Sequence, residues 1–204
     1  MDNNRNSGPE FELAVIRKIM EDSRYTVEYN GIHFIFWGVL VTFCLIANYF
    51  MILNGTADKY SGMLWGILMP LGAVADFFIG WKVAEKNRVS TFAGRLLGSL
   101  WLASGIAMFM FGFLGPLSGA YKPVFISPVI STALGISYFA SGSIQQLPWL
   151  RNLAFGWWAG AILMFFWPGK QTLLVFAVMM LFLQVVPGFI INRNRKRSPE
   201  LKQA

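Results

Sequence analysis

The chain has 204 residues, of which 55% are hydrophobic and only 13% are charged; its mean hydropathy is +0.51 and its net charge is +7. Soluble domains carry about twice this share of charged residues, so the composition excludes a soluble globular domain and a disordered chain and places the protein in a membrane. One cysteine, Cys44, excludes an intrachain disulfide, and one histidine, His33, excludes a bis-His haem or a His-rich metal site.

Six apolar stretches follow a polar N-terminus, each close to the ~20 residues that cross a hydrocarbon core of about 30 Å. We predict membrane spans at 32–53, 63–84, 96–114, 124–142, 153–168 and 173–191. The fifth is the shortest, and 149–151 are candidates for its first turn. The sequence therefore predicts an all-α, polytopic six-helix membrane bundle, preceded by a segment at 1–31 and followed by a basic tail at 192–204.

Positive charges are distributed unevenly about these spans. With the N-terminus in the cytoplasm, fourteen lysines and arginines fall on the cytoplasmic side and three, Lys59, Lys122 and Lys170, fall outside. This bias is the positive-inside signal of membrane proteins. A chain with five spans would put the basic segment at 192–197 on the opposite side, so the charges favour six spans and two cytoplasmic termini.

The first 31 residues are polar and contain no cleavable secretory signal. Apolar residues recur at helical spacing between positions 11 and 30, which predicts a cytoplasmic amphipathic helix. This helix either lies at the lipid headgroups and caps the bundle or docks a cytosolic protein. The basic tail is most simply a topology anchor that meets anionic lipid of the bilayer, and no nucleic-acid partner is expected.

Two neighbouring segments resemble known proteins. IRKIMEDSR, at 16–24, is followed by GIHFIFWGVLV, at 31–41, and together they resemble the start of uncharacterised small six-span bacterial membrane proteins. The resemblance covers the N-terminal segment and the first span. It implies a location in the bacterial inner membrane and brings no activity with it.

Asp76 is the single acidic residue that falls well inside a predicted span. It lies about 4 Å to the cytoplasmic side of the centre of its span, at 1.5 Å per residue. An ionised carboxylate at this depth costs about 2.5–3.5 kcal/mol, so it is expected to face the bundle interior, water or a partner. The spacing of Gly66, Pro70, Ala73 and Gly80 predicts a stripe of small residues on the same helix face. Asp76 is therefore the leading candidate for a functional residue.

Three polar residues complete the predicted substrate- or ion-binding set: Gln184 and Ser104 at the depth of Asp76, and Tyr138 nearer the cytoplasm. No lysine or arginine lies deep enough to neutralise Asp76, so desolvation favours its protonated form. A neutral Asp76 either donates a structural hydrogen bond to a neighbour such as Gln184, or serves proton coupling, cation binding or substrate contact.

Other polar and glycine residues leave alternatives open. His33, at the cytoplasmic entrance of the first span, is either a pH-sensing imidazole or a hydrogen-bonded boundary residue. Asn48 is expected to hydrogen-bond between helices. Pro128 with Gly135 and Pro187 with Gly188 can break the fourth and sixth spans or merely bend them. The GxxxG spacing favours helix association, either within the chain or in a homo-oligomer. It occurs at Gly62/Gly66, Gly94/Gly98 and Gly156/Gly160.

The motifs GxxxxGK[ST], GxGxxG, HExxH, CxxC and GxSxG do not occur in the sequence. A lone carboxylate without a base, metal or nucleophile is weak evidence for an enzyme, and no cofactor or metal is expected. We therefore predict a small-solute or proton/ion-linked transporter-like or sensory bundle that uses Asp76. The alternative is a non-catalytic membrane anchor that docks a cytosolic protein through its N-terminal helix and basic tail.

Overall fold

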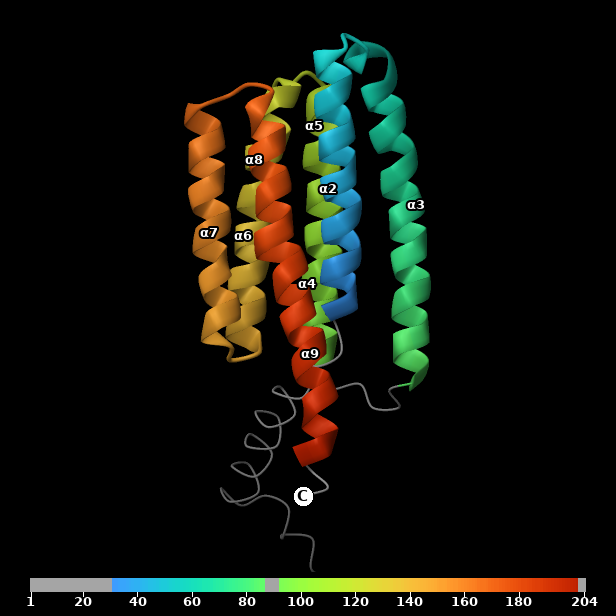
Figure 1. Cartoon of the computed structure of the whole chain (residues 1–204), viewed down its shortest axis with the longest axis vertical. Coiled ribbons are helices and arrows are strands. Elements are labelled where there is room, and N and C mark those ends of the chain that lie inside the picture. Colours follow the sequence, from blue (N-terminus) through green and yellow to red (C-terminus); the bar gives the residue numbers. More distant parts are fainter. Residues whose placement is uncertain (1–30, 87–91, 202–204) are drawn as a thin grey trace, which may run out of the picture.

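The chain is described by a computed structural model that covers the backbone of residues 31–86 and 92–201 and the side chains of 31–82 and 92–193. Within these ranges it is entirely helical. The long helices lie side by side along one direction, with α3 at one edge of the bundle and α7 at the other (Figure 1). The amphipathic helix predicted at 11–30 lies outside the described residues.

Six long helical segments make up the described part of the chain. They are α2 (Gly31–Leu53), α3 (Ala57–Lys86), α4 (Phe92–Phe109) continued by η2 (Met110–Leu114) and α5 (Gly115–Leu117), η3 (Pro123–Phe125) with α6 (Ile126–Ile144), α7 (Pro148–Phe166), and α8 (Gln171–Met179) continued by η4 (Met180–Val185) and α9 (Val186–Leu201). All of these segments except α7 are long and apolar enough to cross a membrane, which gives five candidate spans in the described ranges. The predicted all-helical membrane protein is confirmed at this level, and the fifth predicted span, at 153–168 in α7, stays a prediction.

The α7 helix differs from the other five in composition rather than in regularity. It begins at Pro148, so Trp149, Leu150 and Arg151 belong to it, and its first turns are polar at Arg151 and Asn152. These residues and its tryptophans reduce its mean hydropathy. The helix is nevertheless 19 residues long, about 28 Å at 1.5 Å per residue.

Two prolines widen the helical hydrogen-bond ladder without ending the helices. The π-helical turns η2 and η4 each end two residues before a proline, Pro116 and Pro187 respectively. Proline has no N–H to donate to the carbonyl four residues earlier, and the ladder widens in the turn before it. The helix that begins at α8 therefore continues through Pro187 to Leu201, and α6 runs unbroken past Pro128. Of the two alternatives, these prolines therefore do not break their helices.

Glycines lie at close contacts between helices in the bundle. A Cβ built on Gly142 of α6 would lie 2.3 Å from the backbone nitrogen of Arg151 in α7. A Cβ on Gly188 of α9 would lie 2.8 Å from the carbonyl oxygen of Gly31 in α2. Only a residue without a side chain allows such an approach of two backbones, which is how membrane helices gain packing contacts.

A chain of aromatic side chains fills the centre, where α2, α4, α6, α7 and α8 meet. Its members are Phe34, Trp101, Tyr138, Trp157 and Phe176. The ring centroids of Phe34 and Tyr138 are 5.5 Å apart in an edge-to-face contact, and those of Tyr138 and Trp157 are 5.8 Å apart. These spacings are the favourable ones for aromatic pairs. Tyr138 and Trp157 are completely buried and form the middle of the core.

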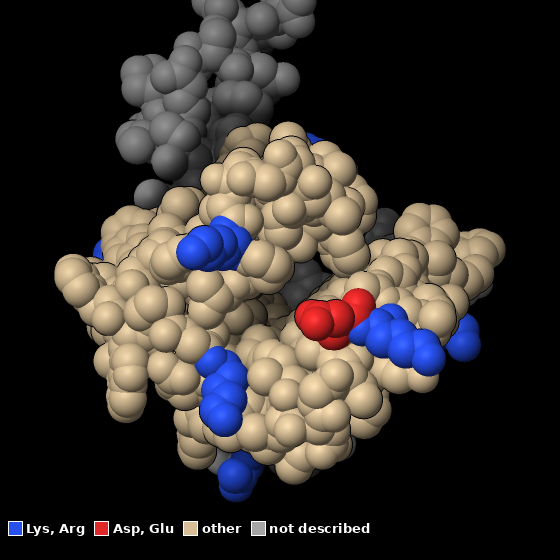
Figure 2. All heavy atoms as spheres, turned by 90° about the horizontal axis from the view of Figure 1, so that it is seen from above, with Lys and Arg blue, Asp and Glu red and all other residues tan. Residues whose placement is uncertain are grey.

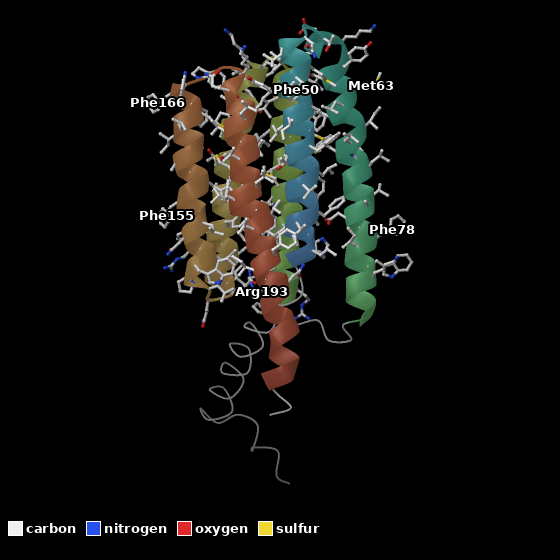
Figure 3. The ribbon with its side chains drawn as sticks, viewed as in Figure 1. Phe50, Met63, Phe78, Phe155, Phe166 and Arg193 are labelled. Carbon is white, nitrogen blue, oxygen red and sulfur yellow. The ribbon has the colours of Figure 1, made fainter. Side chains whose placement is uncertain are left out.

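The outer surface of the bundle is apolar. Phe50, Met63, Phe78, Phe155 and Phe166 point away from the bundle (Figure 3), and each is more than half exposed. Such side chains on every edge would be costly in water but are ordinary in hydrocarbon, where no hydrophobic force drives them inward. The surface therefore agrees with the composition in placing the bundle in a bilayer.

Candidate functional site

Asp76 of α3 makes an acid–base contact with His33 of α2. Asp76 Oδ1 lies 2.5 Å from His33 Nδ1, within hydrogen-bond distance. The side chains of His33 and Asp76 are 23% and 27% exposed, so the pair lies at the edge of the helix interface rather than in the core. It is the one acid–base contact found between the described side chains.

The α2–α3 interface places this pair through a regular helical spacing. Gly72, Asp76 and Gly80 follow one another at four-residue steps and face α2, where His33 meets both Asp76 and Gly80. One turn before Asp76 in α3, a Cβ on Gly72 would lie 2.5 Å from Leu40 Cδ2. The predicted small-residue stripe is therefore corrected.

Three of its members lie on another face of α3. Gly66, Pro70 and Ala73 are exposed, and a Cβ on Gly66 would have no neighbour within 4 Å. Only Gly80 shares the α2-facing side with Asp76. The alternation of small residues at three- and four-residue steps had suggested one stripe, but α3 is rotated so that the stripe through Gly72 makes the contact.

A second polar contact joins α2 and α3 near the opposite end of the bundle. The hydroxyl of Ser61 donates to Asn48 Oδ1, so Asn48 does hydrogen-bond between helices as predicted. His33 and Asn48 are about 22 Å apart along α2 at 1.5 Å per residue. The apolar contact of Trp37 and Leu40 with Gly72 lies between the two polar pairs. The interface between α2 and α3 is therefore polar at both ends and apolar and tightly packed in the middle.

The other predicted residues meet in a separate, uncharged network centred on α6. Tyr138 donates its hydroxyl to Gln184 Oε1 in η4, at 2.8 Å, and both side chains are buried. The hydroxyls of Ser137 and Ser104 lie 2.7 Å apart and join α6 to α4. Because Ser137 and Tyr138 are consecutive, one turn of α6 links three helices through side-chain hydrogen bonds.

Gln184 is therefore the partner of Tyr138, and Asp76 is paired with His33 instead of Gln184. Counting depth from the centres of the spans placed Asp76 and Gln184 at one level and His33 lower. In the structure α3 continues ten residues past Asp76, to Lys86, so Asp76 lies beside the first turn of α2. A 30-residue helix exceeds the hydrocarbon thickness, and its centre is then a poor marker of depth.

The two networks meet at the first turn of α2. His33 faces α3, whereas the next residue, Phe34, packs its ring against Trp101 and Tyr138. A displacement of this turn would therefore move both the acid–base pair and the aromatic core. In the sequence, this link between the two networks corresponds to a polar residue next to an aromatic residue at the start of a helix. That pattern is too common to identify a site.

The glycine pairs divide between packing and open surface. Cβ atoms built on Gly156 and Gly160 of α7 would meet Leu183 and Met179, so this pair packs against the α8–η4 helix within the chain. Gly62 and Gly66 of α3 face open space, as does Gly98 of α4. The GxxxG spacing on α7 thus serves intramolecular packing.

Charged side chains lie mainly at the two ends of the bundle. The end seen from above is mostly uncharged, with scattered basic side chains and acidic atoms beside a central hollow (Figure 2). Lys82, Arg95, Arg151 and Arg193 belong to the other end, where Arg193 projects from α9 (Figure 3). Among the described residues, no three His, Cys, Asp or Glu side chains form a group that could hold a metal ion.

The apolar helices and their apolar outer surface define a multi-pass membrane protein. Neither a protein-family model nor a solved structure matches the chain. A stretch of 73 residues is 40% identical to one of the subunits of the NADH-quinone oxidoreductase of Sulfurimonas denitrificans. The match covers 35% of this chain and 22% of that protein. The similarity agrees with membrane-helical character and is too short to assign a family.

Proposed function

We propose that the protein is a proton-linked transporter-like or sensory bundle whose working groups are Asp76 and His33. The observation that carries the proposal is the 2.5 Å contact of these two titratable groups between two apolar helices. A carboxylate in a membrane helix is costly and is usually retained for proton or ion handling. Tyr138, Gln184 and Ser104 then form the uncharged polar part of the bundle that a small solute would meet.

The pair can exist with different numbers of bound protons, and each state holds α3 differently. A carboxylate facing an imidazolium attracts it strongly, whereas a second proton neutralises the carboxylate and removes this attraction. Lys82, Arg95, Arg151 and Arg193 are the other charged side chains described at this end, and none of them pairs with Asp76. Proton uptake would therefore act mainly on the contact between α2 and α3.

The position of α3 favours such a response. Its packing in the described chain is almost wholly against α2, whereas α2 also packs along α8, η4 and α9. Elements with few packed neighbours open most easily. We infer that α3 moves relative to α2 when the pair gains or loses a proton, and that the Gly72 contact separates the pair from the opposite end.

We also propose that α7 crosses the membrane, which gives six spans in all, and that both termini are cytoplasmic. Phe155 and Phe166 point outward from α7, and the helix packs along α6 more extensively than any other two helices pack. An even number of crossings keeps Arg151 and Arg193 on one side with most of the basic residues. Reporter fusions at both ends would contradict this topology if they were found in opposite compartments.

Proton movement tests the central proposal. The purified protein is reconstituted in liposomes that contain a pH-sensitive dye, and an acid pulse is applied outside. Asp76→Asn and His33→Gln are each expected to reduce the protein-dependent proton flux at least tenfold. Asp58→Asn is the matched control because Asp58 is an exposed carboxylate in the first turn of the same helix.

A distance measurement separates transport from sensing. Spin labels on α2 and α3 should report a pH-dependent separation that Asp76→Asn abolishes. Flux with the movement supports transport, and movement without flux supports sensing. If neither differs between the native protein and Asp76→Asn, the proposal is wrong.

A membrane-anchor subunit is the second candidate function. Two observations favour it: the partial similarity to a subunit of a larger enzyme, and the α9 helix, which extends beyond the rest of the bundle to Leu201 (Figure 1). The basic run at 195–197 lies on this extension. Deleting residues 1–28 or 195–204 should then abolish co-purification of a cytosolic protein without preventing membrane insertion.

A further inference from the structure

Two buried polar atoms in the centre of the bundle have no hydrogen-bond partner among the described residues. They are Trp157 Nε1 and Ser141 Oγ, and both side chains are completely inaccessible to solvent. Buried polar groups in folded proteins are nearly always hydrogen-bonded, to protein or to an ordered small molecule. Two such atoms in one core therefore call for a common explanation.

The two side chains come from facing helices. Gly142 lies opposite Arg151 and Gly135 lies opposite Trp158, so α6 and α7 are antiparallel and Ser141 is level with Asn152, five residues or about 7.5 Å from Trp157 along the bundle. Side chains in a helix lean toward its N-terminus, which directs Ser141 upward on α6 and Trp157 downward on α7. The Tyr138 ring lies one turn from Ser141, with its centroid 5.8 Å from that of Trp157.

The available groups define the chemistry of what they would bind. An indole N–H only donates, and a serine hydroxyl donates or accepts. Tyr138 donates to Gln184 and keeps its oxygen free to accept. The buried polar side chains of the described core are hydroxyls and amides, without a charged group. Such a site suits an uncharged molecule with a hydrogen-bond acceptor and excludes an ion, whose desolvation would not be compensated.

We propose that Trp157 and Ser141 hold one small uncharged hydrogen-bonding molecule against Tyr138, either a water molecule or a small neutral solute. This site is separate from the Asp76–His33 pair, so it can be occupied whether or not the protein conducts protons. It places a polar ligand beside the π-helical turn that carries Gln184. Irregular turns of this kind are frequent at binding sites in helices.

A density map of the full-length protein in lipid nanodiscs, prepared without glycerol or sugars, tests the proposal directly. We expect a peak within hydrogen-bond distance of Trp157 Nε1. A compact peak identifies water, and an elongated peak identifies a neutral solute retained from the cell, which mass spectrometry of the denatured sample would then name. A map that resolves the Trp157 ring and shows no peak overturns the proposal.

Thermal unfolding of two serine variants gives an independent test on one helix. Ser131 is buried like Ser141, but its hydroxyl donates to the carbonyl of Trp157 at 2.7 Å. Ser131→Ala is therefore the matched control and should lower the unfolding midpoint by about 2–4 °C. Ser141→Ala should lower it by a similar amount if a bound molecule pairs with Ser141. A higher midpoint for Ser141→Ala shows that the hydroxyl was unpaired and overturns the proposal.

Discussion

Two pairs of helices differ in how much of each helix is buried: α6 and the α8–α9 helix on one hand, and α3 and α4 on the other. Within the apolar segments, 44% of residues are buried in η3–α6 and 50% in the α8–α9 helix, against 6% in both α3 and α4. Yet α6 is the least apolar of the five candidate spans. In hydrocarbon the apolar side chains need no burial, and the polar and small ones gather inside. Hydropathy therefore identifies spans and does not rank them by depth in the bundle.

The difference also separates two kinds of polar contact. The more buried helices, α6 and the α8–α9 helix, carry uncharged pairs such as Tyr138 with Gln184 and have several packed neighbours. The more exposed α3 carries Asp76, which pairs with His33 of α2, the one extensive neighbour of α3. Under the proposed function, movement would be confined to the contact between α2 and α3, while the uncharged pairs keep the other helices packed.

Two leucines test whether the difference in burial exists in the membrane. Leu150 of α7 is 0% exposed and Leu102 of α4 is 68% exposed. Leu150→Ala is expected to destabilise the protein by about 2–5 kcal/mol, because it leaves a cavity in the core. Leu102→Ala should cost less than about 0.5 kcal/mol, as an outward-facing substitution. Both are measured by denaturant unfolding in detergent micelles and in bicelles.

Equal losses for the two leucine variants in bicelles would contradict the comparison. They would mean that the outer face of α4 is covered by another protein chain in the bilayer. A loss confined to Leu150→Ala would support lipid contact at α4.

Two glycines test the backbone contacts in the same way. Gly142→Ala is expected to cost about 1–3 kcal/mol by overpacking, because its Cβ would meet the backbone of Arg151, which cannot give way. Gly105 of α4 faces open space, so Gly105→Ala should be neutral or stabilise the helix by up to about 1 kcal/mol. Unfolding midpoints check both, and a neutral Gly142→Ala would show that α6 and α7 are further apart than described.

The uncharged buried pair should matter less than core packing. Tyr138→Phe leaves Gln184 Oε1 without its donor, with an expected loss of about 1–2 kcal/mol, since hydrogen bonds between membrane helices are worth little more. The double variant of Tyr138→Phe with Gln184→Leu should lose less stability than the sum of the two single losses, because both polar groups are then removed. A double variant that loses the sum of the single effects would show that the two side chains do not interact.

The smallest effect is expected at Tyr121, in the loop between α5 and η3. Its hydroxyl donates to the carbonyl of Phe111 in η2, and desolvation raises its pKa above the ordinary value of 10.0. Because the folded protein has the higher pKa, the stabilisation is complete below pH 10.0 and is lost as the pH rises through the raised value. Tyr121→Phe should remove this alkaline step, as followed by tyrosinate absorbance and unfolding midpoint. An unchanged step would assign it to another tyrosine.

Several features of the fold could be predicted from the order of residues. Hydropathy and length identified the membrane as the solvent, and the isolated polarity of Asp76 and Asn48 in apolar segments identified residues that need partners. The partner of Asn48 was correctly expected on another helix. These predictions succeed because the cost of transferring each residue into hydrocarbon depends mainly on the residue itself.

Only the tertiary structure decided which side chains meet. The pairing of Asp76 with His33 depends on how far α3 extends past α2, and the pairing of Tyr138 with Gln184 depends on the rotation of α6 against η4. Close contacts at glycines help to set such registers: a missing Cβ at Gly72 lets Leu40 of α2 approach α3, and one at Gly142 lets α7 approach α6. Such contacts depend on pairs of residues from different helices, so the residue pattern within one segment does not reveal them.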